Sequence, residues 1–501
     1  MAVELSWSTQ AALPVLSLLL WLPAAAAFAA HRLARDDESA YRLARGAALA
    51  EALAGVYLLS RFDGGQGGMQ LAERLGGGWL NYHLGVDGVS LLFVLLTAGL
   101  GFLALLYGRD GSTPPPRSYS AAVLAYQAVL VGLFASQDIW LFAWLSAAET
   151  GLALWLLWRW RAGVSGPAMT HASQFLGGAL ILLLAAAVLL GWQHAESAGR
   201  WSFDLADLLE HPAPANLQTA AFFLLLFAFG IRLPLFPLHG WLAPAVQHAG
   251  PLAVAPVFLA GLKTGIYGLV RWVLPILPDA VRHWDLYLVP LAVLGIFYGA
   301  VLALVQQHLG RLLAYAVVSH ASALTLGVLT LDKEGLAGTL LMSIDAGIAS
   351  AGLLFACGMI HRRTGTVFLP RLGDLFDPLP ALGLAFMIAA LTLMGMPGTP
   401  GFDAAHLLLE GTLEVHEWGV AVALASGNVL TAAMLLWAFQ RVFLAQRRGT
   451  RRHGCQAMTL PELIVAGALS AALLAGFYTH PWLSLIEPAL PGPLQHYAQP
   501  H

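Results

Sequence analysis

The sequence predicts an all-α polytopic membrane protein with about fourteen transmembrane helices. Its hydrophobic fraction is 58% and its charged fraction only 11%, whereas soluble domains carry roughly 25% charged residues. Apolar runs long enough to span a bilayer recur along the whole chain. The loops between these runs alternate between basic and poor in Lys and Arg, as the loops of polytopic membrane proteins do.

The expected spans follow these apolar runs in order. The first run has no basic stretch before it, so it predicts a transmembrane helix and not a cleaved signal peptide. The second run contains Glu51 and is the weakest. The runs lie near residues 11–30, 45–61, 88–107, 118–135, 138–158, 174–192, 217–240, 250–273, 286–306, 311–330, 336–360, 379–413, 418–440 and 460–486.

The basic residues predict the orientation of these spans. Loops on one side hold 17 of the 25 Lys and Arg residues, loops on the other side hold six, and Arg232 and Lys263 lie within spans. Because Lys and Arg crowd cytoplasmic loops, the asymmetry supports both the helix count and the orientation. We expect a multi-pass protein of a bacterial inner (plasma) membrane, with both termini in the periplasm.

Several kinds of site find no support in the sequence. The two cysteines give neither a disulfide framework nor a metal signature. A glycine-rich phosphate loop and a metalloprotease motif are absent, and no basic stripe interleaved with aromatic residues suggests nucleic acid. We therefore expect no metal, no cofactor, no catalytic residue and no redox centre in this chain.

Ionisable residues within the spans are the candidate functional residues, because such groups are costly in a bilayer and usually functional. Lys263 lies deep in "LAGLKTGIYGLVRW" and, once desolvated, can release and rebind a proton. The position of Glu149 in the middle of a span favours a functional or ion-pairing role. His320 is equally consistent with a functional histidine and with a histidine of the packed core. Asp403, His406 and Glu410 follow a proline-rich interruption of their span, and these three residues can simply lie in a water-filled cavity. The full set is Glu149, Arg232, His239, Lys263, His320, Asp345, Asp403, His406 and Glu410.

Two spans are interrupted by prolines, in "RLPLFPLHGW" (232–241) and "MGMPGTPGFDAAH" (394–406). Proline removes a backbone donor and breaks a helix, which a membrane tolerates only where the break is buried in protein or lines a cavity. The breaks fall in the seventh and twelfth spans. Paired interruptions of this kind point to repeated halves with sites near the midplane, and an offset of five spans requires the two repeats to be inverted.

Five stretches together resemble the antiporter-like membrane subunits of respiratory complex I. These subunits are related to Mrp antiporter and membrane-bound hydrogenase subunits, and the first stretch is typical of their M-like branch. The stretches are "NYHLGVDGVSLLFVLLTAGL" (81–100), "FGIRLPLFPLHGWL" (229–242), "LAGLKTGIYGLVRW" (259–272), "GRLLAYAVVSHAS" (310–322) and "MGMPGTPGF" (394–402). The resemblance covers nearly the whole chain.

The resemblance implies fourteen helices with two inverted five-helix repeats, each with a broken helix. Helices 1–3 would occupy residues 1–110, the first repeat 111–275, the second repeat 276–445, and helix 14 with the tail 446–501. The implied function is to couple electron transfer from NADH to quinone, in partner subunits, to proton translocation. The expected partners are other membrane subunits of such an assembly and the lipid bilayer.

The resemblance also suggests residues of a proton pathway. Lys263 matches a buried lysine of helix 8, His239 a histidine after the broken helix 7, and His320 a histidine of helix 10. Glu149, Arg232 and Glu410 complete the suggested pathway, with Asp345, Asp403 and His406 as secondary candidates.

This chain also departs from the family pattern. Ala147 stands where the family has a glutamate of helix 5, and Glu149 lies about 200° further around that helix. Arg232 replaces a lysine of helix 7, while Ala346 and Ala405 replace a histidine and an acidic residue. Three functions therefore stay open: a rewired proton pathway, a structural paralogue that does not pump, or an accessory subunit of a hydrogenase-type or inorganic-carbon uptake complex.

Overall fold

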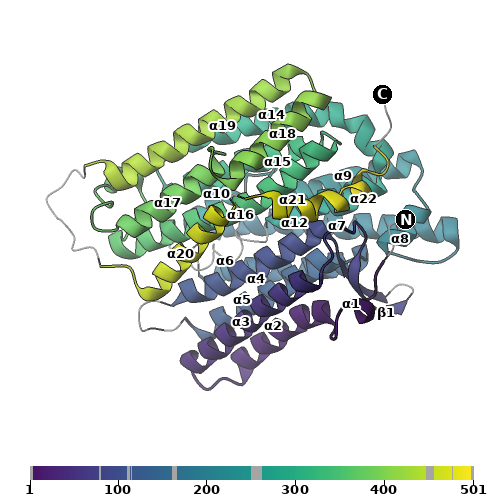
Figure 1. Ribbon diagram of the computed structural model, residues 1–501, viewed down its shortest axis with the longest axis horizontal. Coiled ribbons are helices and arrows are strands. Elements are labelled where there is room, and N and C mark those ends of the chain that lie inside the picture. The colour runs from purple at the N-terminus through teal and green to yellow at the C-terminus, as the bar shows by residue number, and fades with distance from the viewer. Residues whose placement is uncertain are drawn as a thin grey trace.

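Long helices run side by side through most of the molecule (Figure 1). The computed structural model describes residues 4–77, 80–109, 113, 115–160, 166–249, 262–446, 456–476 and 478–497. Within these residues, eleven helices are long and apolar enough to cross a membrane, which confirms a multi-span protein. They are α2 (Val15–Arg32), α3 (Asp37–Arg61), α4 (Gly88–Gly108), α5 (Arg117–Ala135), α6 (Ile139–Arg159), α7 (Gly166–Ala198), α9 (Ala215–Arg232), α14 (Pro278–Leu304), α15 (Leu309–Val328), α16 (Lys333–Thr364) and α19 (Trp418–Phe439).

Besides the expected span at 217–240, in which α9 ends at Arg232, three other expected spans are not single straight helices. The run at 250–273 begins outside the described residues, the run at 379–413 is divided in two, and the last run bends by 76°. Their elements are α12 (Lys263–Gly268), η2 (Leu269–Val273), α13 (Leu274–Ile276), α17 (Pro380–Leu393), α18 (Pro400–Val415), α20 (Leu460–Ala475) and α21 (His480–Ile486). The remaining short helices are α1 (Trp7–Gln10), α8 (Leu205–Glu210), α10 (Leu242–His248), η3 (Leu369–Arg371), η4 (Gln440–Leu444), η5 (Glu487–Ala489) and α22 (Pro491–Leu494).

An antiparallel hairpin, β1 (Gln70–Gly77) and β2 (Leu80–Val86), adds a small β element, which the sequence did not predict, to the mostly helical chain. The hairpin lies at one end of the helices, where backbone hydrogen bonds can be satisfied outside the bilayer core. Its Glu73 accepts hydrogen bonds from the backbone N–H groups of Leu16 and Ser17, at 2.8 and 2.9 Å. These are free donors in the first turn of α2, so the hairpin caps that helix.

Aspartates in the sequence determine where several helices begin. Asp87 accepts a hydrogen bond from the Ser90 N–H at 2.9 Å, and the Ser90 side chain bonds back to Asp87, which forms a capping box on α4. Asp138 caps α6 through the N–H groups of its first turn. At the far end of α16, Gly365 adopts a φ of 68°, the left-handed conformation that closes many helices.

Helix α16 lies at the centre of the molecule and packs against α4, α15, α17, α18 and α20. A Cβ at Gly338 would overlap the backbone of α18 at Leu408, so the absence of a side chain lets these two helices approach closely. The segment α20–α22 then crosses the face formed by α4 and α16 (Figure 1).

The end of this C-terminal segment contacts α4 and α13, which lie much earlier in the chain. A Cβ at Gly88, the first residue of α4, would overlap the carbonyl oxygen of Leu485. The hydroxyl of Tyr497 donates to the carbonyl of Leu274 at 2.9 Å. The C-terminal segment therefore connects elements that are far apart in sequence.

Both expected helix breaks are present. Helix α9 ends at Arg232 and α10 begins at Leu242, while α17 ends at Leu393 and α18 begins at Pro400. At the first break, the indole N–H of Trp241 donates to the carbonyl of Ile231 at 3.0 Å. This bond satisfies one of the carbonyl groups that an ending helix leaves without a partner.

Candidate functional site

A buried ion pair joins α6 to the end of α9. Arg232 Nη1 lies 3.0 Å from Glu149 Oε2, and the two side chains are 3% and 10% exposed. The hydroxyl of Tyr126 on α5 donates to the other carboxylate oxygen at 2.8 Å. Glu149 thus faces the interior and reaches Arg232, as a rewired pathway requires.

Arg232 is held from several sides. Its Nη2 donates to Thr150 Oγ1 at 3.0 Å and to the Ser146 carbonyl at 3.2 Å, and its Nη1 also donates to Thr264 Oγ1 at 3.4 Å. A planar guanidinium with several fixed donors suits such a set of acceptors. The cation beside the break is therefore paired and clamped between α6 and α12.

Lys263, the residue before Thr264, lies in a small cavity of about 30 Å³ at the helix breaks. Leu233 and Pro234 follow α9, Leu393 ends α17, and all three line the cavity together with Lys263 and His320. A cavity of this size holds about one or two water molecules. Both breaks therefore meet at one cavity that contains a lysine and a histidine.

His320 belongs to α15 and His239 to the first break, but only His320 lines this cavity. The His239 ring stacks on Phe236, with centroids 5.9 Å apart, and meets the Tyr298 ring of α14 at 5.0 Å. Its Nδ1 is buried without a hydrogen-bond partner among the described residues. The structure thus places Lys263 and His320 in one cavity. His239 lies outside it, against the rings of Phe236 and Tyr298.

The other ionisable candidates, in the second half of the chain, lie in different surroundings. Asp345 on α16 is 7% exposed, whereas His406 and Glu410 on α18 are 65% and 49% exposed and lie 3.8 Å apart. Asp403 Oδ2 accepts a hydrogen bond from Thr479 at 2.6 Å. The structure does not bring Glu410 to the Lys263 cavity, because its helix packs on α16 through the opposite face, which carries Leu408.

A second buried ion pair was missed in the sequence, where Arg271 was counted among the loop residues. Both carboxylate oxygens of Asp87 lie 2.7 Å from Arg271 Nη2, and Arg271 Nε donates to the Tyr267 hydroxyl at 3.2 Å. Arg271 lies in the π-helical turn η2. The pair ties this turn to the start of α4, where the Asp87–x–x–Ser90 capping signature was the only local signal.

A polar cluster outside the helices of spanning length fixes the hairpin to α8. The His83 ring lies 2.6 Å from Asp204 and 2.8 Å from Glu4, and Asn81 donates to Asp204 at 2.9 Å. Burial alone would lower the pKa of His83, but hydrogen bonds to the two carboxylates and their charges raise it to about 9. A hydrogen bond to His83 likewise holds the pKa of Glu4 below its usual value.

These shifts predict a pH-dependent stability. In the unfolded chain a histidine has a pKa of about 6.5, so the contribution of His83 is complete below pH 6.5 and disappears as the pH rises to about 9. The Glu4 contribution has the opposite sign and is lost in acid. We expect His83→Gln to lower the melting temperature in detergent clearly at pH 6 and much less at pH 9.

The matched control for that measurement is the exposed His31, for which a His31→Gln variant should melt like the parent protein at both pH values. An equal effect of His83→Gln at pH 6 and pH 9 would show that the ring contributes packing and not charge.

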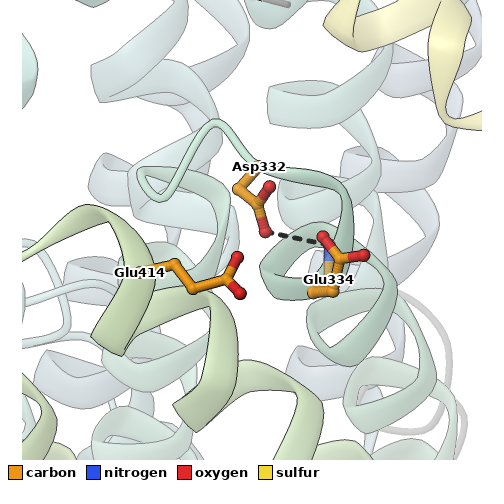
Figure 2. A group of neighbouring side chains, drawn as sticks. All are labelled: Asp332, Glu334 and Glu414. Atoms are coloured by element: carbon orange, nitrogen blue, oxygen red, sulfur yellow. Dashed lines mark hydrogen bonds between the residues drawn. The ribbon is translucent and has the colours of Figure 1, made fainter. Parts of the chain in front are cut away.

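One group of carboxylates has the spacing that a metal ion requires. Asp332, Glu334 and Glu414 each have an oxygen within 4.8 Å of the others (Figure 2). Asp332 already caps α16, accepting from the N–H groups of Glu334 and Gly335 at 3.0 and 3.3 Å. Because the group is partly exposed and Asp332 has this structural role, it assigns no metal to the chain.

Known proteins are similar to this chain in sequence and in fold. The family described as "NADH:quinone oxidoreductase/Mrp antiporter, TM" matches residues 136–431. NADH-quinone oxidoreductase subunit M of Rhodobacter capsulatus is 30% identical over 96% of this chain and 97% of its own length. A chain of respiratory complex I from Thermus thermophilus superposes with a TM-score of 0.87 at 27% identity, covering 97% of this chain and 100% of that one.

A chain of the Mrp complex from Dietzia shares the fold, with a TM-score of 0.83 at 22% identity over 95% of this chain and 97% of its own. The match of sequence and fold extends over the helix breaks, the Glu149–Arg232 pair and the Lys263 cavity. The chain therefore belongs to the family of NADH:quinone oxidoreductase and Mrp antiporter transmembrane subunits.

Proposed function

We propose that this chain is a membrane-arm subunit of a complex I-like NADH:quinone oxidoreductase, and that it couples electron transfer in partner subunits to proton translocation. The relatives named as NADH-quinone oxidoreductase subunit M support this assignment. The observation that carries it is the meeting of both helix breaks at the cavity of Lys263 and His320. This cavity can hold water and is lined by a lysine that can titrate. Such a site between broken helices is suited to stepwise proton transfer.

In this proposal Lys263 carries the proton and Arg232 is a fixed cation. Arg232 effectively never deprotonates, and it contacts Thr264, the residue after Lys263. It would act on Lys263 through its charge, which Glu149 offsets at 3.0 Å. Movement of Glu149 away from Arg232 would disfavour a charged lysine, since like charges repel in a desolvated site. His320 would pass the proton into the second half of the chain.

The remaining candidates would connect this centre to the surroundings. His239 would act at the first break, while Asp345, Asp403 and His406 would act in the second half. Glu410 lies on the exposed face of α18, where a neighbouring membrane subunit could receive its proton.

We also propose fourteen transmembrane helices with inverted repeats at residues 111–275 and 276–445, flanked by residues 1–110 and 446–501. The two breaks at equivalent positions support the repeats. Elements α1 and α22 lie toward the same end of the bundle (Figure 1), as an even number of spans requires. The hairpin end would then face the periplasm of a bacterial inner membrane, opposite the basic loops.

The function can be tested by deleting the chain from its native membrane. We expect an affinity-tagged chain to co-purify with NADH:quinone oxidoreductase activity, and we expect the deleted complex to move fewer protons per NADH. Co-purification with a hydrogenase or with a carbon-uptake activity would contradict the proposal. An unchanged proton ratio in an assembled complex that lacks the chain would identify a structural paralogue.

A further inference from the structure

A second and much larger cavity lies on the other side of α16. Its volume is about 270 Å³, and α4, α16, α20 and Trp482 form its walls. Leu96 and Leu100 of α4 and Ile344 and Ile348 of α16 are typical of its apolar lining. Among the described residues that line it, Asp345 is the only ionisable one.

Asp345 is buried in this wall and is not hydrogen-bonded there. Its side chain is 7% exposed, and its Oδ2 has no hydrogen-bond partner in the described part of the chain. Neighbouring Ala346 and Ser350 line the Lys263 cavity, whereas Asp345 lines the larger one, although the charge of Lys263 still acts on Asp345. A buried carboxylate without a partner costs several kcal/mol, so this position favours a cationic or hydrogen-bonding ligand.

Water satisfies this carboxylate poorly. An ordered water needs about two to four polar partners, and an apolar cavity of about 150 Å³ in another protein stays dry and binds benzene. The cavity beside Asp345 is larger, at about 270 Å³, and almost entirely apolar. Its size and lining fit an apolar body, and its one carboxylate fits a single positive charge.

We propose that this cavity binds an amphipathic cation, with an apolar body between α4 and α20 and one ammonium or guanidinium group at Asp345. Access is available from the side of the bundle, because Gly99 of α4 lines the cavity and is also exposed. Trp482 adds an aromatic face, which attracts cations. An anionic lipid headgroup would be repelled by the carboxylate, which distinguishes this site from one for a phosphate.

The test uses 4-phenylbutylamine and its neutral counterpart 4-phenylbutan-1-ol as labelled probes, measured by equilibrium dialysis against the solubilised intact complex. We expect saturable binding of the amine and weaker binding of the alcohol. Asp345→Asn should weaken amine binding by at least about tenfold and leave alcohol binding unchanged. Retained alcohol binding also shows that the variant has kept its cavity.

A second variant fills the cavity without touching the carboxylate. A Cβ at Gly99 meets no atom within 4 Å, so Gly99→Leu can place its side chain in the cavity without a clash. We expect this variant to weaken binding of both probes at least about tenfold. Gly177→Leu on α7 is the matched control, since a Cβ there also meets nothing within 4 Å, and it should change neither.

Three results would overturn the proposal: amine binding that survives Gly99→Leu, equal amine binding by the parent protein and Asp345→Asn, or binding that never saturates. Equal affinity of the parent protein for amine and alcohol would assign the cavity to apolar chains alone. Because binding is measured directly, the outcome does not depend on whether the chain transports protons.

Discussion

Replacing Lys263 with alanine will abolish proton transport through this subunit. Lys263 is one of only two lysines in the sequence, and it lines the cavity where both helix breaks meet. Alanine removes the only lysine amine of that cavity and leaves Arg232, which cannot release a proton under physiological conditions. Electron transfer should persist, because the proposed redox chemistry belongs to partner subunits.

The measurement is the number of protons moved per NADH oxidised by the complex reconstituted in vesicles. The matched control is Lys333→Ala, since the other lysine is half exposed and pairs with Glu487 at 3.2 Å. We expect the control to pump normally and Lys263→Ala to lose the whole contribution of this chain. Normal stoichiometry in Lys263→Ala would refute an active channel and leave a structural role.

Replacing Arg232 with methionine will strongly destabilise the protein. The substitution leaves the Glu149 carboxylate buried beside Tyr126 and Thr150 without its cation. Removing one partner of a buried ion pair typically costs about 3–5 kcal/mol. The double variant Glu149→Gln/Arg232→Met should recover part of this loss, because it no longer buries an unpaired charge.

A double-mutant cycle of unfolding in detergent micelles measures this coupling. Arg200→Met provides the control, because Arg200 is 64% exposed in its pair with Asp207 and such pairs contribute at most about 1 kcal/mol. Additive effects of the two substitutions would mean that Glu149 and Arg232 do not stabilise each other. Unchanged pumping by Glu149→Gln would separately argue against a pathway through this pair.

The features that local chemistry controls could be predicted from the sequence. Apolar runs predicted about fourteen spans, since a bilayer requires such runs, and eleven helices of spanning length lie within the described residues. Pro234 and Pro400 marked the two breaks because proline removes backbone donors. The capping aspartates Asp87 and Asp138 stand directly before the helices α4 and α6.

Contacts between distant residues could not be predicted in the same way. Alignment to the family placed the glutamate of helix 5 at Ala147, which left the direction of Glu149 open. The buried face of α6 contains Ser146, Glu149, Thr150 and Ala153. The helical spacing of these small and polar residues is the one signal in the sequence that points to an inward-facing glutamate. The partner of Arg271 is 184 residues away, and no local pattern indicates such a separation.

The hairpin shows a different limit. Its strands are short and polar at several positions, and a search for spanning apolar runs overlooks them. Asp204, which follows α7 in the chain, holds the hairpin through His83. The sequence contains these residues but not their proximity, which only the packing of α6 and α7 creates.

The C-terminal segment has a consequence for biosynthesis. Leu485 and Tyr497 contact Gly88 and Leu274, residues that a ribosome releases much earlier. Membrane helices enter the bilayer in the order of their synthesis, and the N-terminal part of a chain generally folds first. Helices α4 and α16 must therefore wait in an incomplete state, with the cavity beside Asp345 uncovered, until α20 and Trp482 emerge and complete its walls.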